Sequence, residues 1–350
     1  MRECALCGKG NASESLQVCV DCIRSGRAEA LNYATAAHKQ IRSKYGLPAE
    51  PPKSEGGIRC NLCSNECMLK DGERSYCGLK MNVDGRLTSL VPPHQALLYS
   101  YIDPLPTNCC AAWFCPGSAQ FGKENVAVFF FDCNFDCLFC QNASHKDFRA
   151  VKAVSGTDFV ARVTHNENAY CVCFFGGSPE PQLPFAIRAS EAILAEKDVR
   201  ICWEWNGCGN KALVKRVASL SFKSGGIVKF DLKAFDPNLS VALSGVPNKR
   251  AYENFEMIAT EFFEKSEPPV LTATTLLVPY YVDEKEVEQI AQCIAGINPN
   301  IPYSLLVFHP SFYIQDLPIT PREQVFKCYE TAKTYLNKVN IGNQQLLKTF

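Results

Sequence analysis

The feature that most constrains the fold is a series of six apolar, β-rich stretches between residues 125 and 308. They are 125–131, 170–175, 199–205, 226–231, 270–278 and 303–308. Most are separated by segments with helical periodicity; in one, Val287, Ile290 and Ile294 fall on one face behind an Asp283 cap. Near-continuous apolar strands that alternate with helices predict an α/β fold in which helices cover a parallel sheet.

Three cysteines, Cys133, Cys137 and Cys140, follow the first of these stretches directly. Three thiolates at C-x3-C-x2-C spacing can bind one cube of iron and sulfide, and no fourth cysteine follows in the same loop. One iron would therefore stay open for a substrate or cofactor. The alternative is a zinc site or unrelated buried thiols, but zinc usually takes four ligands from paired C-x2-C knuckles.

The spacing of these cysteines, Phe139 just before the last of them and the position after a strand resemble the cluster loop of the radical S-adenosylmethionine (SAM) superfamily. The resemblance is to its pyruvate formate-lyase activase-like branch, which includes the AmmeMemoRadiSam-type proteins. It implies a partial (β/α)6 radical SAM barrel, a [4Fe-4S] cluster on the three cysteines and SAM on the open iron. It also places Phe139 beside the adenine.

A glycine-rich segment follows the second stretch, at the end where parallel barrels carry their chemistry. Gly176, Gly177 and Ser178 precede Glu180. The segment is similar to the family's Gly-Gly-Glu turn, which contacts the amino group of SAM, with extra residues before Glu180. Taken alone it reads as an ordinary turn, but its position after the second strand favours SAM binding.

Later strand ends supply further candidates. Asn206 lies in a turn similar to the family's Thr-Asn-Gly, with Trp205 in place of the threonine. Asp231 and Lys233 match its Asp-Leu-Lys and can hold polar parts of SAM or substrate, with a structural salt bridge as an equal alternative. His309, after the last strand, is a candidate proton donor or substrate contact, although a lone histidine is more often structural.

The N-terminal region carries two C-x2-C pairs, Cys4 with Cys7 and Cys19 with Cys22, separated by eleven residues. Two such pairs can close a tetrahedron around one metal ion and stabilise a segment too small for its own hydrophobic core. The spacing favours zinc over an iron–sulfur cluster. A helix is expected from about residue 20 to 45, followed by a Pro- and Gly-rich linker over 46–57.

Two more cysteine groups precede the first predicted strand. The second group is Cys60, Cys63, Cys67 and Cys77, and both zinc and an auxiliary iron–sulfur cluster are compatible with it. The third group, Cys109, Cys110 and Cys115, can complete a site with the second, supply a redox thiol near the active centre or pack as small hydrophobes. The cysteines interpreted as buried packing residues are Cys171, Cys173, Cys202, Cys293 and Cys328.

These patterns divide the chain into a zinc knuckle (1–25), a helix and linker (26–57), a cysteine-rich region (58–120), the partial barrel (121–343) and a C-terminal tail (344–350). The 36 basic and 36 acidic residues balance, so no nucleic-acid partner is expected. No apolar run is long enough for a membrane span, and the N-terminus lacks signal-peptide features. The 20 cysteines therefore indicate metal binding in the reducing cytoplasm of an anaerobic organism.

The resemblance implies an enzyme that cleaves SAM reductively to methionine and a 5′-deoxyadenosyl radical, which abstracts hydrogen from a protein or peptide substrate. A glycyl-radical enzyme is one candidate for that substrate. A small metabolite is the alternative substrate, and a non-catalytic metal-binding adaptor is the alternative of another class. A low-potential ferredoxin or flavodoxin is the electron donor expected by analogy.

Overall fold

One curved sheet of eight strands organises the molecule. The computed structural model describes residues 1–149 and 151–348. The strands, from one edge of the sheet to the other, are β8 (Leu98–Pro104), β9 (Glu124–Phe130), β11 (Ala169–Gly176), β12 (Arg200–Trp205), β13 (Val228–Asp231), β14 (Leu271–Leu277), β15 (Tyr303–Val307) and β16 (Val339–Gly342). All neighbours pair in parallel except β8 with β9. The predicted α/β fold with a parallel sheet is confirmed, and each predicted stretch overlaps one strand.

The two edge strands, β8 and β16, were not predicted. β8 pairs antiparallel with β9 and exposes Tyr99, Tyr101 and Ile102, so it lacks a continuous apolar run. β16 has only four residues, all of them half-buried. Continuous apolar runs identify strands that are buried on both faces, so they give no signal for the two edge strands of this sheet.

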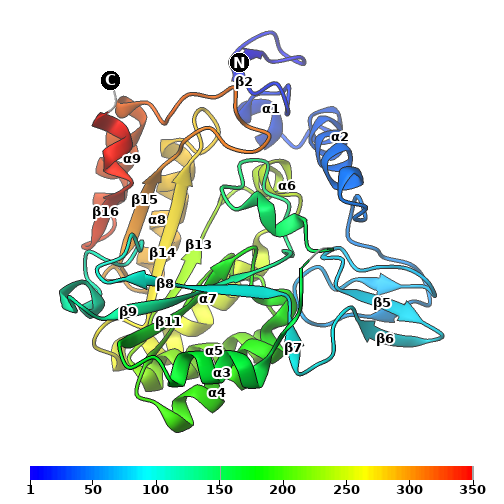
Figure 1. Cartoon of the computed structure of the whole chain (residues 1–350). Coiled ribbons are helices and arrows are strands. Elements are labelled where there is room, and N and C mark those ends of the chain that lie inside the picture. The colour runs from blue at the N-terminus through cyan, green and yellow to red at the C-terminus, as the bar shows by residue number, and fades with distance from the viewer. Residues whose placement is uncertain (150, 349–350) are drawn as a thin grey trace.

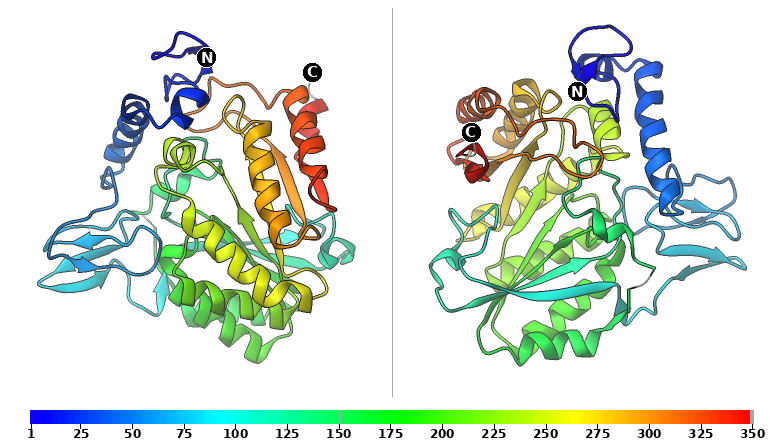
Figure 2. Two further views of the ribbon diagram at one scale, coloured as in Figure 1. Left: turned by 180° about the vertical axis from the view of Figure 1, so that it is seen from behind. Right: turned by 45° about the horizontal axis from the view of Figure 1, so that its top comes forward.

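Helices lie outside the curved sheet (Figures 1 and 2). They are α3 (Gly156–Thr164), α4 (Leu183–Glu196), α5 (Lys211–Ser224), α6 (Pro237–Ser244), α7 (Lys249–Phe262), α8 (Glu284–Ile297) and α9 (Arg322–Lys333). Asp283 caps α8 as predicted, since its side chain accepts a hydrogen bond from the backbone N–H of Glu286 at 3.1 Å. This cap satisfies one of the free amides of the first helical turn.

The single N-terminal helix predicted over 20–45 is instead two helices. They are α1 (Val20–Arg24) and α2 (Ala28–Lys44), and Gly26 between them has a φ of 68°. A left-handed residue ends a helix, and glycine adopts that conformation without steric cost. Both helices pack against α6, so the N-terminal region lies beside the barrel (Figure 2).

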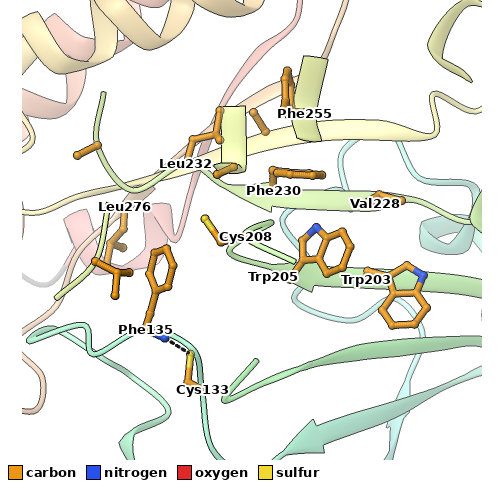
Figure 3. Close-up of a cluster of buried hydrophobic side chains, with 14 of the residues drawn as sticks. Cys133, Phe135, Trp203, Trp205, Cys208, Val228, Phe230, Leu232, Phe255 and Leu276 are labelled. Carbon is orange, nitrogen blue, oxygen red and sulfur yellow. Dashed lines mark hydrogen bonds between the residues drawn. The ribbon is translucent and has the colours of Figure 1, made fainter. Parts of the chain in front are cut away.

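The inner strands alternate between apolar residues that face the helices and polar residues that face the barrel interior. On β13, Phe230 contacts Phe255 of α7, with ring centroids 5.4 Å apart, whereas Lys229 lines an interior cavity. On β12, Trp205 packs against Phe230 at 5.6 Å, as Figure 3 shows. Since side chains alternate along a strand, the helices bury one face and leave the other for polar groups.

Short elements complete the chain. The two-residue strands are β1 (Arg2–Glu3), β2 (Asn11–Ala12), β3 (Ile58–Arg59), β4 (Met68–Leu69), β7 (Gln95–Ala96) and β10 (Val154–Ser155). A hairpin of two four-residue strands, β5 (Lys80–Val83) and β6 (Arg86–Ser89), projects from the cysteine-rich region. In the predicted C-terminal tail, Gln344–Lys348 form a 3-10 turn, and residues 349 and 350 lie outside the described residues.

Candidate active site

Most predicted site residues converge on one cavity at the carboxyl ends of β9, β11, β12 and β13, which we call the cluster-loop cavity. Its volume is about 170 Å³. The predicted residues on its wall are Cys133, Cys137, Phe139, Cys140, Gly176, Gly177, Ser178, Asn206, Asp231 and Lys233. Four separate loops supply them, and the parallel topology places all four loops at the same end of the barrel.

The loop that carries the three cysteines is fixed by local hydrogen bonds. Asp132 has a φ of 69°, and its carboxylate accepts a hydrogen bond from the backbone N–H of Cys133 at 2.6 Å. The amide of Phe135 donates to Cys133 Sγ at 3.3 Å, the contact dashed in Figure 3. The amide of Asp136 donates to the carbonyl oxygen of Ser244, at the end of α6, at 2.8 Å. These hydrogen bonds therefore fix the conformation of the loop that carries the three thiols.

Burial raises the pKa of the thiols of Cys133, Cys137 and Cys140, that of Cys140 to about 11. At neutral pH the three groups are thus protonated when no metal is bound. Because thiolates are the ligands of iron, loading this loop with metal must release protons. The ammonium of Lys233 opposes the effect of burial on Cys137, since a nearby cation favours the thiolate.

A buried group of ions ties the cluster loop to α2. The carboxylate of Asp136 lies 2.7 Å from His38 Nδ1, 2.5 Å from Lys146 Nζ and 3.5 Å from Arg42 Nη1. Burial opposes the charge on Asp136, but the His38 hydrogen bond and the two cations together hold its pKa below the ordinary value. His38 and Arg42 belong to α2, so the N-terminal helix supports the cysteine loop directly.

The two glycines at the end of β11 are required by the chain's own backbone. Gly176 has a φ of 76°, which favours glycine. A Cβ added to Gly177 would lie 2.2 Å from the carbonyl oxygen of Asp132 and 2.6 Å from that of Phe130. The glycines therefore let the end of β11 lie against the end of β9 and the start of the cluster loop.

A hydrogen-bond network joins three strand ends behind these glycines. Asn206 Nδ2 lies 2.9 Å from Ser178 Oγ and 2.8 Å from Asn134 Oδ1. The Ser178 hydroxyl donates to the carboxylate of Glu180, whose pKa burial raises to about 7. Glu180 does not line the cluster-loop cavity. It supports Ser178 from behind, and its predicted role as a SAM contact stays a prediction.

Two polar atoms of the cavity wall are left without partners. Asp231 Oδ1 and His145 Nδ1 are buried and make no hydrogen bond within residues 1–149 and 151–348. The other Asp231 oxygen accepts a hydrogen bond from Lys233. Burial alone would lower the pKa of the Lys233 ammonium, but the nearby Asp231 and Cys137 raise it above its ordinary value. Buried polar atoms without partners are rare in native proteins. A ligand with amino and hydroxyl groups, such as SAM, fits this wall.

His309 also lies off the cavity wall, and some wall residues were not predicted. His309 is half-buried outside the cavity wall, with Nδ1 3.1 Å from Ser311 Oγ, so its proposed contact with substrate stays a prediction. The wall also includes Gln141, Asn142 and His145, which the sequence reasoning did not single out. Gln141 and Asn142 directly follow Cys140, and this adjacency in sequence could have identified them as residues of the cavity wall.

The four N-terminal cysteines form a compact group. The sulfur atoms of Cys4, Cys7, Cys19 and Cys22 all lie within 4.8 Å of one another; Cys4 and Cys22 are 3.7 Å apart, and Cys7 and Cys19 are 3.8 Å apart. Tetrahedral Zn–S bonds of about 2.3 Å place neighbouring sulfurs about 3.8 Å apart. The sulfur positions therefore fit one zinc ion, the metal that the spacing favours.

The second cysteine group is more open. Within the two described ranges, no three of its sulfur atoms, from Cys60, Cys63, Cys67 and Cys77, all lie within 4.8 Å of one another. A single zinc ion needs a tighter set, whereas a cluster of several irons spans more space. The group docks on the cluster loop, because the Asn65 side chain donates to the carbonyl oxygen of Asn134 at 2.7 Å.

The third cysteine group does not complete the second. Cys109 and Cys110 lie instead near Glu204 in a different cavity, inside the barrel. Of the cysteines predicted to be buried, Cys173 and Cys202 are buried and Cys171 is only half-buried. All three line this same cavity. Strand periodicity directs these side chains inward, and the barrel interior is not filled at that level.

The fold and the site define the class of protein. Residues 128–294 match the model of the Radical SAM superfamily. The chain contains a radical SAM domain and is a radical SAM enzyme. No helix among the described residues is both long and apolar enough to cross a membrane.

Two curated proteins and one solved structure illustrate what the chain is similar to. An uncharacterised protein of Methanocaldococcus jannaschii is 28% identical over 309 residues, 82% of this chain and 81% of that relative. The isethionate sulfite-lyase activating enzyme of Desulfovibrio desulfuricans is 30% identical over 135 residues, 38% of this chain and 40% of the relative. A domain of pyruvate-formate lyase-activating enzyme from Bacteroides vulgatus superposes with a TM-score of 0.40 at 20% identity, covering 49% of this chain and 98% of that domain.

Proposed function

We propose that this enzyme activates or modifies a protein or peptide by abstracting a hydrogen atom from it. The observation that carries the proposal is the convergence of Cys133, Cys137 and Cys140 with a polar wall that has unpaired buried polar atoms. Its likeness to an activating enzyme supports the choice of a protein substrate, and a glycyl-radical enzyme is the candidate within that class.

When bound and reduced by one electron from an external donor, a [4Fe-4S] cluster would pass that electron to SAM, whose S–C5′ bond would break to give methionine and a 5′-deoxyadenosyl radical. Cys133, Cys137 and Cys140 would hold the cluster. Asp231 would accept a hydrogen bond from the amino group of SAM, with Lys233 fixing the orientation of its carboxylate. The walls of the cluster-loop cavity would have to keep water from the reacting atoms, because such reactive species require it.

A small metabolite is the second candidate substrate. The barrel interior holds another cavity of about 300 Å³ that shares wall residues with the cluster-loop cavity. That volume is at the lower end of the range typical of small-molecule sites. Copurification distinguishes the two candidates. A stable protein partner would support a protein substrate, and the absence of a partner would favour a small metabolite.

The metal proposals follow the sulfur geometry. Zinc is proposed for the N-terminal group and an auxiliary iron–sulfur cluster for the group of Cys60, Cys63, Cys67 and Cys77. Its docking on the cluster loop would let such a cluster relay electrons from the proposed ferredoxin or flavodoxin donor.

The test is formation of 5′-deoxyadenosine by anaerobically reconstituted protein with SAM and dithionite. The wild type and a Cys293→Ala control, altered on α8, are expected to form it, and a Cys133/Cys137/Cys140→Ala triple variant is not. Equal product from the triple variant would contradict the assignment of the cluster ligands. A wild type that binds a four-iron cluster but forms no product with any peptide or metabolite tested would favour the adaptor alternative.

A further inference from the structure

A second cavity, the interior cavity, lies inside the barrel next to the cluster-loop cavity. Its volume is about 300 Å³. The residues that line both cavities are Gln141, Asn142, Phe175, Glu204 and Leu306. A ligand in the interior cavity would therefore lie beside the proposed SAM site. Nothing in the function proposed so far uses the thiols on its wall.

The loop between β8 and β9, residues 105–123, covers one end of the interior cavity. This loop leads into the amino end of β9, whereas the cluster loop follows the carboxyl end of β9, so the two loops lie at opposite ends of that strand. The loop reaches across the open side of the sheet to β15, where Ser304 Oγ donates to the carbonyl oxygen of Cys110 and accepts from Trp113 Nε1, both at 3.0 Å. Figure 1 shows this loop beside β16. Two cysteines are thus anchored at the cavity.

Three metal-ligating side chains meet where this loop contacts β12. The sulfur atoms of Cys109 and Cys110 and a carboxylate oxygen of Glu204 all lie within 4.8 Å of one another. One metal ion can reach three donors held this closely. Thiolates select soft or borderline ions such as zinc and iron over magnesium or calcium.

The surroundings balance the charge of such a complex. Two thiolates and one carboxylate around a divalent ion leave a net charge of −1. Lys229 is 2% exposed, and its Nζ lies 3.3 Å from Cys173 Sγ and 3.9 Å from Glu204 Oε2. A buried ammonium needs an anionic neighbour. Glu204 is such a neighbour, and a metal–thiolate complex that includes Glu204 would keep an anionic group beside Lys229 and would itself be neutralised.

We propose that Cys109, Cys110 and Glu204 bind one soft divalent metal ion on the wall of the interior cavity. Three protein ligands leave one position of a tetrahedral ion open, as in catalytic rather than structural zinc sites. The open position would face the cavity and take water or a donor atom of the substrate. Binding of this ion does not depend on SAM or on the radical reaction.

The test is the metal content of the full-length protein purified anaerobically, without SAM or reductant. A Cys109/Cys110→Ala double variant is expected to lose one equivalent of metal relative to the wild type. Cys171→Ala is the matched control, because Cys171 lines the same cavity but bonds to Asn125 Oδ1 at 3.3 Å rather than joining the trio. It is expected to keep the full metal content.

Cobalt(II) added after removal of metal gives a second readout. The wild type is expected to show one more equivalent of thiolate-to-cobalt absorption than the double variant. Glu204→Gln keeps the side-chain shape and removes its charge, so it is expected to weaken zinc binding at this site at least about tenfold. This variant decides the question if the double variant does not fold.

Three results would overturn the proposal. They are an unchanged metal content in the double variant, an equal loss in Cys171→Ala, and wild-type zinc affinity in Glu204→Gln. Each would leave the radical SAM function untouched, because that function is measured by 5′-deoxyadenosine and this site by bound metal.

Discussion

At the scale of single residues, one methyl group at Gly177 would press on two backbone oxygens at once. The added Cβ would lie 2.2 Å from Asp132 O and 2.6 Å from Phe130 O, and backbone atoms of a buried strand cannot move away cheaply. We expect Gly177→Ala to lower the free energy of unfolding by about 1–3 kcal/mol. Chemical denaturation of the metal-free protein measures the change.

Gly296→Ala is the control for this substitution. Gly296 lies in α8, and a Cβ there meets no atom within 4 Å. Alanine favours helix by up to about 1 kcal/mol over glycine, so stability should rise slightly. Two variants that are destabilised equally would show that the close contact at Gly177 is not the cause.

The sulfur geometry of the N-terminal group leads to a second prediction. Cys22→Ser removes one ligand from a tetrahedron whose Cys4–Cys22 edge is 3.7 Å. Because four thiolates bind zinc far more tightly than three thiolates and a hydroxyl, we expect the zinc content to fall by one equivalent. Elemental analysis measures it, with Cys293→Ser as the control that keeps its zinc. Iron rather than zinc in the wild-type site would contradict the assignment.

Glu180 makes the stability of the metal-free chain depend on pH. Burial raises its pKa from 4.5 to about 7, so the folded chain binds this proton more tightly than the unfolded chain does. The stability it contributes is complete below pH 4.5 and is lost as the pH rises through about 7. We expect Glu180→Gln to flatten the fall in the free energy of unfolding between these values. Glu196→Gln, at an exposed position of α4, should leave the slope unchanged.

At the scale of elements, the contact of α2 with the cluster loop depends on Asp136. Asp136→Asn keeps the shape but leaves Lys146 and Arg42 buried without their carboxylate. Breaking a buried ion group in this way costs about 3–5 kcal/mol. We expect that loss in the free energy of unfolding and a lower iron content after reconstitution, since the loop that holds the cysteines loses its support.

The control is an exposed ion pair. Glu191 and Arg216 are 2.7 Å apart and about half exposed, so Glu191→Gln should cost less than about 1 kcal/mol. If Asp136→Asn behaves like this control, α2 does not support the cluster loop.

The elements also separate what the sequence could predict from what it could not. The six inner strands were predictable because each buries an apolar face under helices. The Cys133 loop and the Gly176–Gly177 turn were predictable because they follow those strands at the same barrel end. By contrast, the break at Gly26, the ions around Asp136 and the approach of Cys109 to Glu204 depend on contacts between distant segments. Residue spacing carries no signal for such contacts.

At the scale of the whole molecule, the N-terminal cysteine group is joined to the segment between β14 and α8, late in the barrel sequence. Tyr281 Oη accepts a hydrogen bond from the Ser13 amide and donates to the carbonyl oxygen of Val18, both at 2.9 Å. The group that precedes the barrel in sequence therefore packs against the residues that lead into α8. Its metal would stabilise this contact as well as its own fold.

Arg24 is the ionic part of that connection. It lies 2.6 Å from Asp283 and 3.1 Å from the fully buried Glu286, whose other oxygen accepts from the amides of Phe235 and Asp236 at the start of α6. Arg24→Ala leaves the Glu286 charge without a cation, so we expect faster hydrogen–deuterium exchange in α1 and in the first turn of α6, with α4 unchanged. Arg216→Ala removes an exposed cation and should change neither. Unchanged exchange in α1 and α6 for Arg24→Ala would mean that apolar packing alone holds the N-terminal region on the barrel.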